Sequence, residues 1–421
     1  MQELTRLDML FILSLTATWI LLLYHVFLTY GGYRYFLKSM EADEKIHKIS
    51  DENLPGVSIL VPAHNEEMVI ARTVDAICRS DYPQDKLEVI VINDSSTDKT
   101  GEILARKQKE YPFLKVVTIK PPIGAKGKSN ALNNGLKEAT GDYIIVYDAD
   151  NTPERRAIRY LASTIISDKR LGAVVGKFRT RNRDVNLLTR FINLETISFQ
   201  WLVQAGRFYW FKLTTITGTN FIIRRDIVEK IGGWRLDALT EDTELTIRVY
   251  NEGYYIKWIP KAVTWEQEPE KLKVWLKQRT RWARGNMWVI SYYIRRVFAL
   301  NSRISWDVIY FFFTYIIFFT SVIASDVIFI LGLTGIARLS ITGPFFIIWI
   351  MAYILFILET FISLSLERGE GNFKNFLLTA LMYFTYCQLW LYLVFRAVWM
   401  ALKDKITGKG FYWYKTERSA R

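Results

Sequence analysis

The chain has few of the residues that build disulfide-bonded or zinc-binding proteins: two cysteines and three histidines among 421 residues. Cys78 and Cys387 lie far apart, one in a segment of soluble character and the other in an apolar run. Neither a disulfide framework nor a cysteine–histidine metal cluster is therefore indicated. Internal repeats and low-complexity linkers are also missing, which argues against a repeat architecture.

Acidic residues are the less common charged type: the chain has 55 Lys and Arg but only 42 Asp and Glu, which gives a formal charge of +13. A basic balance is typical of proteins that bind nucleic acid, anionic lipid or phosphate-bearing substrates. Here the basic residues crowd beside apolar segments, which favours a lipid bilayer as partner and no nucleic acid. Half of the residues are hydrophobic, yet mean hydropathy is only +0.08, so we expect a soluble domain joined to a few membrane spans.

Four apolar runs approach the roughly 20 residues that cross a bilayer. They cover residues 9–30, 308–333, 344–366 and 376–402, the last interrupted by Arg396. No small-residue cleavage site follows the first run, so it is interpreted as a retained anchor. Lys and Arg follow the first run and precede the second, which predicts a cytoplasmic middle segment in a multi-pass plasma-membrane protein.

The expected domains are an anchor over residues 1–48, a cytoplasmic domain over 49–300 and a membrane region with a basic tail over 301–421. The side of the C-terminus stays open. Three spans after a cytoplasmic domain put the tail outside, whereas Lys403 and Lys405 near the end of the last run favour the inside.

The middle segment alternates short β-branched runs with helical patterns, which predicts an α/β domain with a mostly parallel sheet. Strands are expected at 57–62, 87–93, 114–119, 143–147 and 173–177, and helices at 67–79, 99–110 and 128–139. Ligands of such sheets bind at the carboxyl ends of the strands. Polar motifs of this sequence follow three of those ends.

Glu66 follows the first strand and Asp94 ends the second, where carboxylates suit a nucleoside pocket; strand-end turns with capping residues are the alternative. Asp148 and Asp150 follow the fourth strand. Two hard oxygen donors at this spacing suit Mg²⁺ or Mn²⁺ holding a diphosphate, so these two are the candidate metal ligands.

Two motifs lie further along the chain. Glu241 and Asp242 follow Thr240, where an acidic residue can take a proton from an attacking hydroxyl, although helix capping by Thr240 is an alternative. In the segment from Gln278 to Trp282, Arg281 suits a diphosphate clamp and Trp282 offers a flat face to a sugar ring. Taken alone, that segment is also typical of a basic amphipathic helix at a membrane surface.

In this order, the motifs resemble those of the processive, inverting branch of the family 2 glycosyltransferases, which includes cellulose, chitin, hyaluronan and poly-N-acetylglucosamine synthases. The resemblance covers about residues 50–300 and implies a Rossmann-like, type A nucleotide-sugar domain inserted between transmembrane helices. It implies Asp242 as the catalytic base with Glu241 beside it, and Asp148 and Asp150 at the metal and nucleotide. It implies further substrate contacts at Glu66, Asp94, Lys128, Thr219, Gln278, Arg281 and Trp282.

Two departures from the family pattern affect details of this resemblance. Ser95 stands where a glycine is usual after the uridine-binding aspartate. The turn at 217–220 lacks the aromatic and cysteine residues that are often found there. These departures bear on acceptor contacts and leave the expected reaction unchanged.

The resemblance implies an enzyme that adds sugars from UDP-N-acetylglucosamine or UDP-glucose to a growing β-linked polysaccharide and passes it through the membrane. Helices near 187–212 and 271–294 would lie at the membrane surface, with core-facing helices as the alternative. The tail at 410–415 looks most like that of poly-N-acetylglucosamine synthases. A single-transfer enzyme acting on polyprenyl phosphate is the rival, and an accessory subunit is left open.

Overall fold

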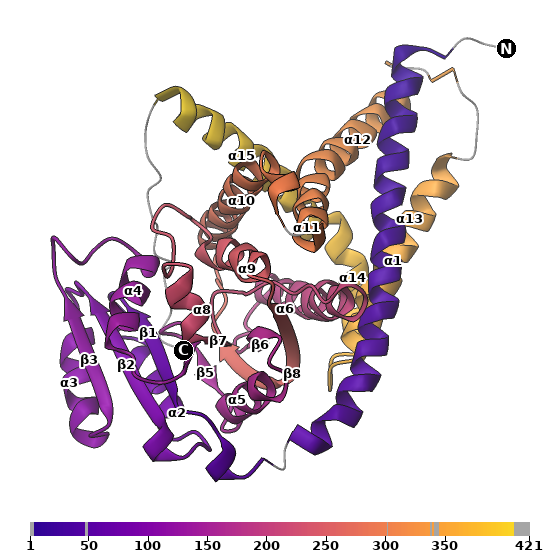
Figure 1. Cartoon of the computed structure of the whole chain (residues 1–421). Helices are drawn as coiled ribbons and strands as arrows, with labels where there is room; N and C mark the ends of the chain where they lie inside the picture. Colours follow the sequence, from indigo (N-terminus) through magenta and orange to yellow (C-terminus); the bar gives the residue numbers. More distant parts are fainter. Residues whose placement is uncertain (1–3, 47–48, 301, 337–338, 341–344, 408–421) are drawn as a thin grey trace.

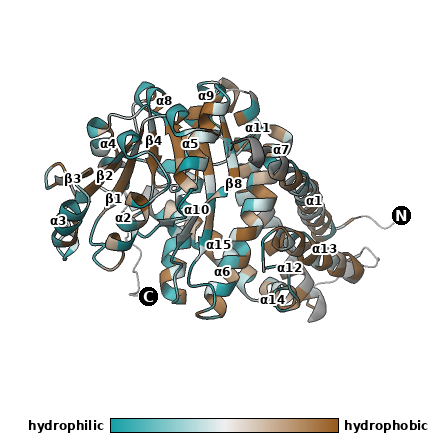
Figure 2. Ribbon diagram, turned by 90° about the horizontal axis from the view of Figure 1, so that it is seen from below, coloured by the Kyte–Doolittle hydropathy of each residue, from teal (hydrophilic) through white to brown (hydrophobic). Residues whose placement is uncertain are grey.

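The computed structural model describes residues 4–46, 49–300, 302–336, 339–340 and 345–407. An α/β domain lies beside and beneath a group of long apolar helices, and α1 (Arg6–Ile46) runs along the whole height of the molecule (Figure 1). The predicted tail motif at 410–415 lies outside the described residues. Figure 2 shows the polar outer helices of the α/β domain and the apolar residues of its strands and of the long helices.

The sheet has eight strands in the order β3-β2-β1-β4-β7-β6-β8-β5. Its first half is parallel and is built from β1 (Val57–Ala63), β2 (Leu87–Asp94), β3 (Leu114–Ile119) and β4 (Tyr143–Val146). Between them run α2 (Ile70–Cys78), α3 (Thr100–Glu110) and α4 (Lys128–Glu138). The strands read as continuous apolar runs because both faces are covered: α2, α3 and α5 (Ala157–Ser167) pack on one face, and α4 on the other. The predicted strands and helices of this half are confirmed.

The second half contains β5 (Thr152–Pro153), β6 (Leu171–Thr180), β7 (Phe221–Arg224) and β8 (Tyr255–Glu266). β7 pairs antiparallel with both β4 and β6, so the sheet is more mixed than the sequence predicted. Because β7 runs against β4, its first residue, Phe221, pairs with the last residue of β4, Val146. The loop before β7 and the loop after β4 therefore meet at one edge of the sheet.

Two helical segments lie between the sheet and the long helices, and we call them the interface helices. The first consists of α6 (Leu187–Ser198), a π-helical stretch (Phe199–Ala205) and α7 (Gly206–Phe211); the second is α10 (Leu272–Ile294). Both predicted helices are present. The apolar stripe of the first is buried in the same core as the sheet, at Phe191, Leu194, Ile197, Trp201, Ala205 and Phe208.

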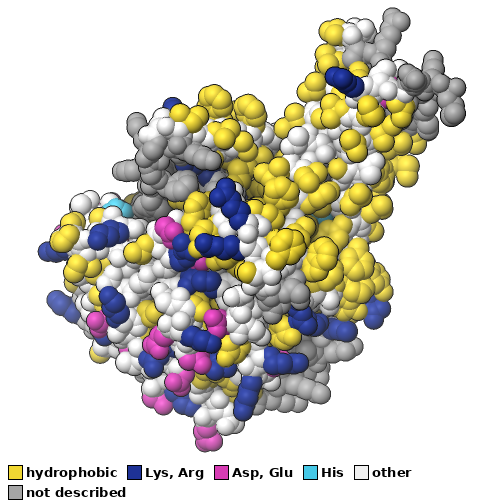
Figure 3. Space-filling view, turned by 45° about the horizontal axis from the view of Figure 1, so that its top comes forward, with side chains coloured by type: hydrophobic (Ala, Val, Ile, Leu, Met, Phe, Trp, Pro, Cys, Tyr) yellow, Lys and Arg dark blue, Asp and Glu magenta, His cyan; other side chains and the backbone are white. Residues whose placement is uncertain are grey.

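The predicted apolar runs form α1, α11 (Ser302–Phe312) continuing into α12 (Phe319–Leu333), α13 (Phe345–Ser365), and α14 (Phe373–Phe384) followed by α15 (Tyr386–Thr407). Four stretches among the described residues are long and apolar enough to cross a membrane. The last run is broken at Thr385, where φ is −118° and ψ −78°, and Arg396 lies within α15 without interrupting it. Figure 3 shows the hydrophobic side chains gathered over the part of the molecule that projects from the α/β domain.

Contacts at the helix ends show which ends share a side. The backbone N–H of Ser340, just before α13, donates to Asp8 at the start of α1 (2.8 Å). At the other end of α13, the buried side chain of Glu370 pairs with Arg183 and Arg190 of the α/β domain at 2.9 and 3.0 Å. The start of α1 and the start of α13 therefore lie together, away from the end of α13 that contacts the α/β domain.

Candidate active site

A cavity of about 840 Å³ opens at the carboxyl ends of β1, β2 and β4. Every site residue expected from the sequence lines it. From the strand ends these are Glu66, Asp94, Lys128, Asp148, Asp150 and Thr219, and from the helices Glu241, Asp242, Gln278, Arg281 and Trp282. Residues more than two hundred positions apart in the chain thus face one space.

Asp94 occupies the end of the cavity formed by β1 and β2. It is the last residue of β2, is 5% exposed, and its Oδ1 accepts a hydrogen bond from the N–H of Ala125 (2.6 Å). The Nδ1 of His64 is hydrogen-bonded to the backbone carbonyl oxygen of Asp94 (2.6 Å), and this contact joins the ends of β1 and β2. Ser95 has φ 57°, a left-handed conformation that glycine adopts freely. This backbone geometry explains why a glycine is usual at this position in the family.

Lys128 is the first residue of α4, and its side chain lines the cavity. Its Nζ is 2.5 Å from Oδ1 of Asp148 and 3.6 Å from Oε1 of Glu241, and it donates to the carbonyl of Gly218 (2.8 Å). Burial alone lowers the pKa of Lys128, but Asp148 and Glu241 outweigh it, so the pKa lies above its ordinary value. The ammonium therefore stays charged and joins the loops of Asp148 and Gly218 to the start of α9 (Glu241–Asn251).

Asp148 and Asp150 lie on the loop after β4, and Asp150 is 3% exposed. Thr219, from the loop before β7, faces them and is hydrogen-bonded to Asn151. Two carboxylates supply hard oxygen donors of the kind that Mg²⁺ and Mn²⁺ bind. No group of three or more His, Cys, Asp or Glu among the described residues is placed to hold a metal. Two carboxylates leave most coordination positions of such a cation open, so the pair fits a cation that takes its other ligands from water or from a bound molecule.

Glu241 and Asp242 form the first turn of α9 (Glu241–Asn251). Thr240 occupies the N-cap position, but its side chain makes no capping hydrogen bond, so capping does not account for this motif. Gly218, with φ 78°, is needed opposite Asp242, because a Cβ there would lie 3.0 Å from the Asp242 Oδ2. The Asp242 carboxylate thus lies directly against the loop before β7.

The pKa of Asp242 is raised to about 7. Burial is the largest cause, followed by the negative charge of Glu241, while Lys128 and Arg281 act in the opposite direction. A carboxylate with a pKa near neutrality is suited to accept a proton during a reaction at physiological pH.

The far end of the cavity is formed by α10 and by the long apolar helices. Gln278, Arg281 and Trp282 face it from α10. Phe311 of α11, Tyr315 of the π-helical stretch Phe313–Phe318 and Trp390 of α15 also line it. The cavity therefore continues from the strand ends to side chains of the candidate membrane helices.

Glu195, a charged residue within the buried stripe of α6, is a further candidate that the sequence motifs did not include. Its carboxylate accepts hydrogen bonds from Tyr386 Oη (2.7 Å) and Trp390 Nε1 (2.8 Å), both on α15. It also pairs with Nη2 of buried Arg279 (3.0 Å), whose guanidinium lies 4.0 Å from the centre of the Trp282 ring. Glu195 thereby joins α6, α10 and α15 at the cavity wall. A charged residue in an apolar stripe was the one signal that pointed to it.

Of the aromatic residues in the last apolar run, the structure brings only some to the cavity. Trp390 lines it, and Tyr386 reaches its wall through Glu195. Tyr392 is exposed on the outer side of α15, and Tyr383 packs on Tyr353 of α13. Trp390 and Tyr392 are two positions apart on α15, about 200° around the helix, so they lie on opposite sides of it.

Comparison with known proteins agrees with this geometry. The family model described as glycosyltransferase like family 2 matches residues 55–285. The probable glycosyltransferase YdaM of Bacillus subtilis (strain 168) is 51% identical over 410 residues, or 97% of each chain. A poly-beta-1,6-N-acetyl-D-glucosamine synthase of Staphylococcus aureus (strain COL) is 32% identical over 271 residues, covering 63% of this chain and 64% of that protein.

The fold is similar to that of a mannosyltransferase, PcManGT from Pyrobaculum calidifontis, in a complex with GDP-Man and Mn²⁺. The TM-score is 0.54 at 21% sequence identity, covering 86% of this chain and 98% of that chain. This likeness supports the expected type A α/β fold for the sheet domain, to which four candidate membrane helices are joined. The matched family model and the long alignment together establish that the chain belongs to the family 2 glycosyltransferases.

Proposed function

We propose that the protein is a processive, inverting glycosyltransferase that builds a β-linked polysaccharide from a UDP-sugar and passes it into the membrane region. The observation that carries this proposal is the continuous cavity, which has carboxylates at its strand end and aromatic rings of candidate membrane helices at its far end. A product formed between these ends has a direct route toward the membrane helices. The α/β domain would lie in the cytoplasm, where sugar nucleotides are made.

The strand end would hold the donor. Asp94 and Glu66 would contact the uridine, and Lys128 and Arg281 would contact the diphosphate oxygens, which suit charge-assisted hydrogen bonds. Asp148 and Asp150 would hold Mg²⁺ or Mn²⁺, which when bound neutralises charge on the diphosphate leaving group. Thr219 would position the loop of Asp148, because its Oγ1 accepts the Asp148 N–H (3.0 Å).

Asp242 would act as the general base. Asp242 lines the cavity, and the charges of both Lys128 and Arg281 act on its carboxylate, so an acceptor hydroxyl beside it would lie close to the donor diphosphate. As Asp242 removes that proton, the hydroxyl oxygen attacks the anomeric carbon. The bond between this carbon and the UDP oxygen breaks in the same step, so UDP leaves and the configuration is inverted. Glu241 would hold Lys128 in place and raise the pKa of Asp242 through its charge.

The far end would hold the growing chain. Sugar rings stack on flat aromatic faces, and the aromatic residues Trp282, Tyr315 and Trp390 line this part of the cavity. Holding several sugars at once favours repeated additions over a single transfer. N-acetylglucosamine is the first donor sugar to test, because the aligned relative is a poly-N-acetylglucosamine synthase, and glucose is the second.

The test is UDP release by the purified chain in nanodiscs with Mg²⁺ or Mn²⁺, with UDP-N-acetylglucosamine and UDP-glucose supplied separately and the products sized. We expect turnover with one donor and a long product that a matching glycosidase digests. A product limited to a lipid-linked monosaccharide would show that the enzyme is a single-transfer enzyme acting on polyprenyl phosphate. Turnover with neither donor, in protein that remains folded, would contradict the assigned donors.

A further inference from the structure

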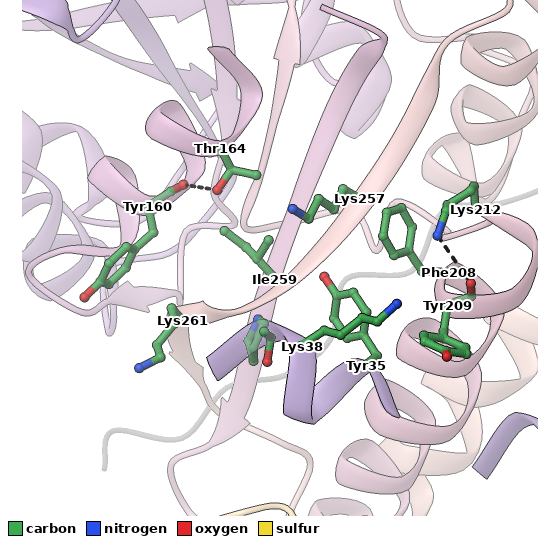
Figure 4. A pocket seen from close by; sticks show the side chains of 12 residues that line it. Tyr35, Lys38, Tyr160, Thr164, Phe208, Tyr209, Lys212, Lys257, Ile259 and Lys261 are labelled. Carbon is green, nitrogen blue, oxygen red and sulfur yellow. Dashed lines mark hydrogen bonds between the residues drawn. The ribbon is translucent and has the colours of Figure 1, made fainter. Parts of the chain in front are cut away.

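A second cavity, of about 180 Å³, lies between the end of α1, α5, α7 and β8 (Figure 4). It shares no lining residue with the active-site cavity. Four lysines line it, Lys38, Lys212, Lys257 and Lys261, together with the rings of Tyr35, Tyr160, Phe208 and Tyr209. We call it the lysine pocket, and neither sequence analysis nor the family assignment gives it a role.

Two of these lysines are held in place by aromatic rings. The Nζ of Lys38 lies 5.0 Å from the centre of the Tyr209 ring, and that of Lys212 lies 5.1 Å from the centre of the Phe208 ring. Among the residues whose side chains the structure describes, no carboxylate forms an ion pair with either lysine. The pocket therefore presents a pair of positioned ammonium groups that no carboxylate among these described side chains neutralises.

The two ammonium groups also repel each other. The pKa of Lys212 is lowered, first by burial and then by the charges of Lys38 and Arg303. Lys212 itself has φ 60°, a left-handed conformation that is unfavourable for a side chain with a Cβ. An anion between these groups would relieve the repulsion, since it would favour their charged forms.

The position of the pocket along α1 matches the phosphate layer of a bilayer. The apolar run of α1 ends near Tyr30, and the eight residues to Lys38 add about 12 Å at 1.5 Å per residue. A lysine stem points back toward the helix start by roughly 6 Å, so with α1 along the bilayer normal the ammonium would lie about 6 Å beyond the hydrocarbon edge. The headgroup layer is itself roughly 5–8 Å thick on each side.

A group of aromatic residues marks the same boundary independently. Trp210 of α7 stacks on Phe27 of α1, with ring centres 4.3 Å apart, and on Tyr30 at 6.1 Å. Trp and Tyr gather where the hydrocarbon meets the headgroups. The lysine pocket begins just beyond this group, and Figure 3 shows Lys and Arg side chains along the border between the hydrophobic helices and the α/β domain.

We propose that the lysine pocket binds the phosphate of an anionic phospholipid, with Lys38 and Lys212 as its main contacts and the acyl chains lying along α1. Its volume is below the roughly 300 Å³ at which small-molecule sites begin, so it suits a phosphate with part of its glycerol better than a sugar nucleotide. A lipid bound there would join α1, α7 and β8 and so hold the catalytic domain against the membrane.

The test uses the delipidated full chain in a neutral detergent and native mass spectrometry. Phosphatidylglycerol, phosphatidylcholine and inorganic phosphate are titrated separately. The test variant is Lys38→Gln with Lys212→Gln, and the matched control is Lys109→Gln with Lys137→Gln, two exposed lysines of α3 and α4. A further variant, Lys212→Arg, retains the charge if the double variant proves unstable.

We expect phosphatidylglycerol to bind at least tenfold more tightly than phosphatidylcholine. Each lysine near an anionic surface contributes roughly fivefold in affinity, so the double variant should bind phosphatidylglycerol about 30-fold more weakly. The control pair and Lys212→Arg should stay within about threefold of wild type. Equal binding of the two lipids, or an unchanged double variant, would overturn the proposal. Inorganic phosphate binding as tightly as phosphatidylglycerol would assign the pocket to a free anion and would equally overturn it.

Discussion

The two ends of the active-site cavity are built in different ways. At the strand end, Asp94 and Asp148 lie at or just after the ends of strands that are buried on both faces, so the sheet fixes their positions. At the far end, the wall consists of side chains from α6, α10 and α15, which are joined through the single carboxylate of Glu195. Under the proposed function, the strand end would keep the reacting groups in fixed positions, and the far end would hold the growing chain.

This difference assigns separate consequences to separate substitutions. Changes at the strand end should lower the rate of sugar transfer. Changes at the far end should alter the length of the product while donor turnover continues. A substitution at the strand end that changed only the product length, or one at the far end that changed only the transfer rate, would contradict this difference between the two ends.

The largest effect is expected from Asp242→Asn. Loss of the general base should lower the rate of UDP release by about 10³-fold, within the 10²–10⁴ range of such catalysis. The matched control is Asp237→Asn, an exposed aspartate paired with Arg235 in the loop before α9, which should leave the rate within twofold. Residual turnover near wild type in Asp242→Asn would exclude Asp242 as the base.

Asp150→Asn should lower the rate by roughly 100-fold, because it removes one of two hard ligands for the cation. Calorimetric titration with UDP supplies a second readout. In the wild type, Mn²⁺ should strengthen UDP binding, and in the variant this dependence on Mn²⁺ should largely disappear. A variant that binds UDP with an unchanged response to Mn²⁺ would show that Asp150 is not a metal ligand.

The pH dependence should follow the raised pKa of Asp242, which is about 7. Only the deprotonated carboxylate can accept a proton, so kcat/KM should fall about tenfold per unit as the pH drops below 7. Above 7 it should level off. The measurement is the rate of UDP release at low donor concentration between pH 5 and 8.5. A profile that is flat over this range would contradict the assignment.

Glu195→Gln should shorten the product severalfold while UDP release stays within about threefold of wild type. The substitution weakens the ion pair with Arg279 and the hydrogen bonds to α15 but keeps the shape of the side chain. Glu229→Gln, an exposed glutamate of α8 (Arg225–Lys230), is the control. If the product length and the rate of UDP release fell by the same factor, Glu195 would contribute to the catalytic step or to folding. The proposed role in holding the growing chain would then be wrong.

The smallest effect on activity is expected from Glu370→Gln, in the connection between α13 and α14. This buried carboxylate pairs with Arg179, Arg183 and Arg190. Breaking a buried charge network destabilises, so the apparent Tm should fall by roughly 5 °C while the rate changes less than twofold. Glu252→Gln, in the partly exposed pair with Lys230, should leave the Tm unchanged. A large loss of activity without loss of Tm would give this connection a catalytic role.

The strand end was predictable from sequence because its signals are local. An apolar strand followed at once by a carboxylate places Asp94 and Asp148 without knowledge of distant residues. The parallel half of the sheet was predicted for the same reason. The antiparallel strand β7 was missed, although its pairing with β4 brings Thr219 beside Asp148.

The far end was predictable only in part, because its contacts join segments distant in the chain. The motif from Gln278 to Trp282 was found, whereas Glu195 meets Trp390 across nearly two hundred residues and carries no local pattern. The break at Thr385 was also missed. Within α15, Trp390 lines the cavity while Tyr392 is exposed, a difference that the hydropathy of the run does not encode.

The most direct test of the account is synthesis in sealed proteoliposomes whose catalytic domains face outward. Donor and Mg²⁺ are supplied outside, and the product is then treated with a glycosidase with and without detergent. The account predicts that much of the polymer resists digestion until detergent is added, because the cavity delivers it through the membrane helices. Complete digestion without detergent, from vesicles shown to be sealed and to make long polymer, would contradict the proposal that synthesis and translocation share one path.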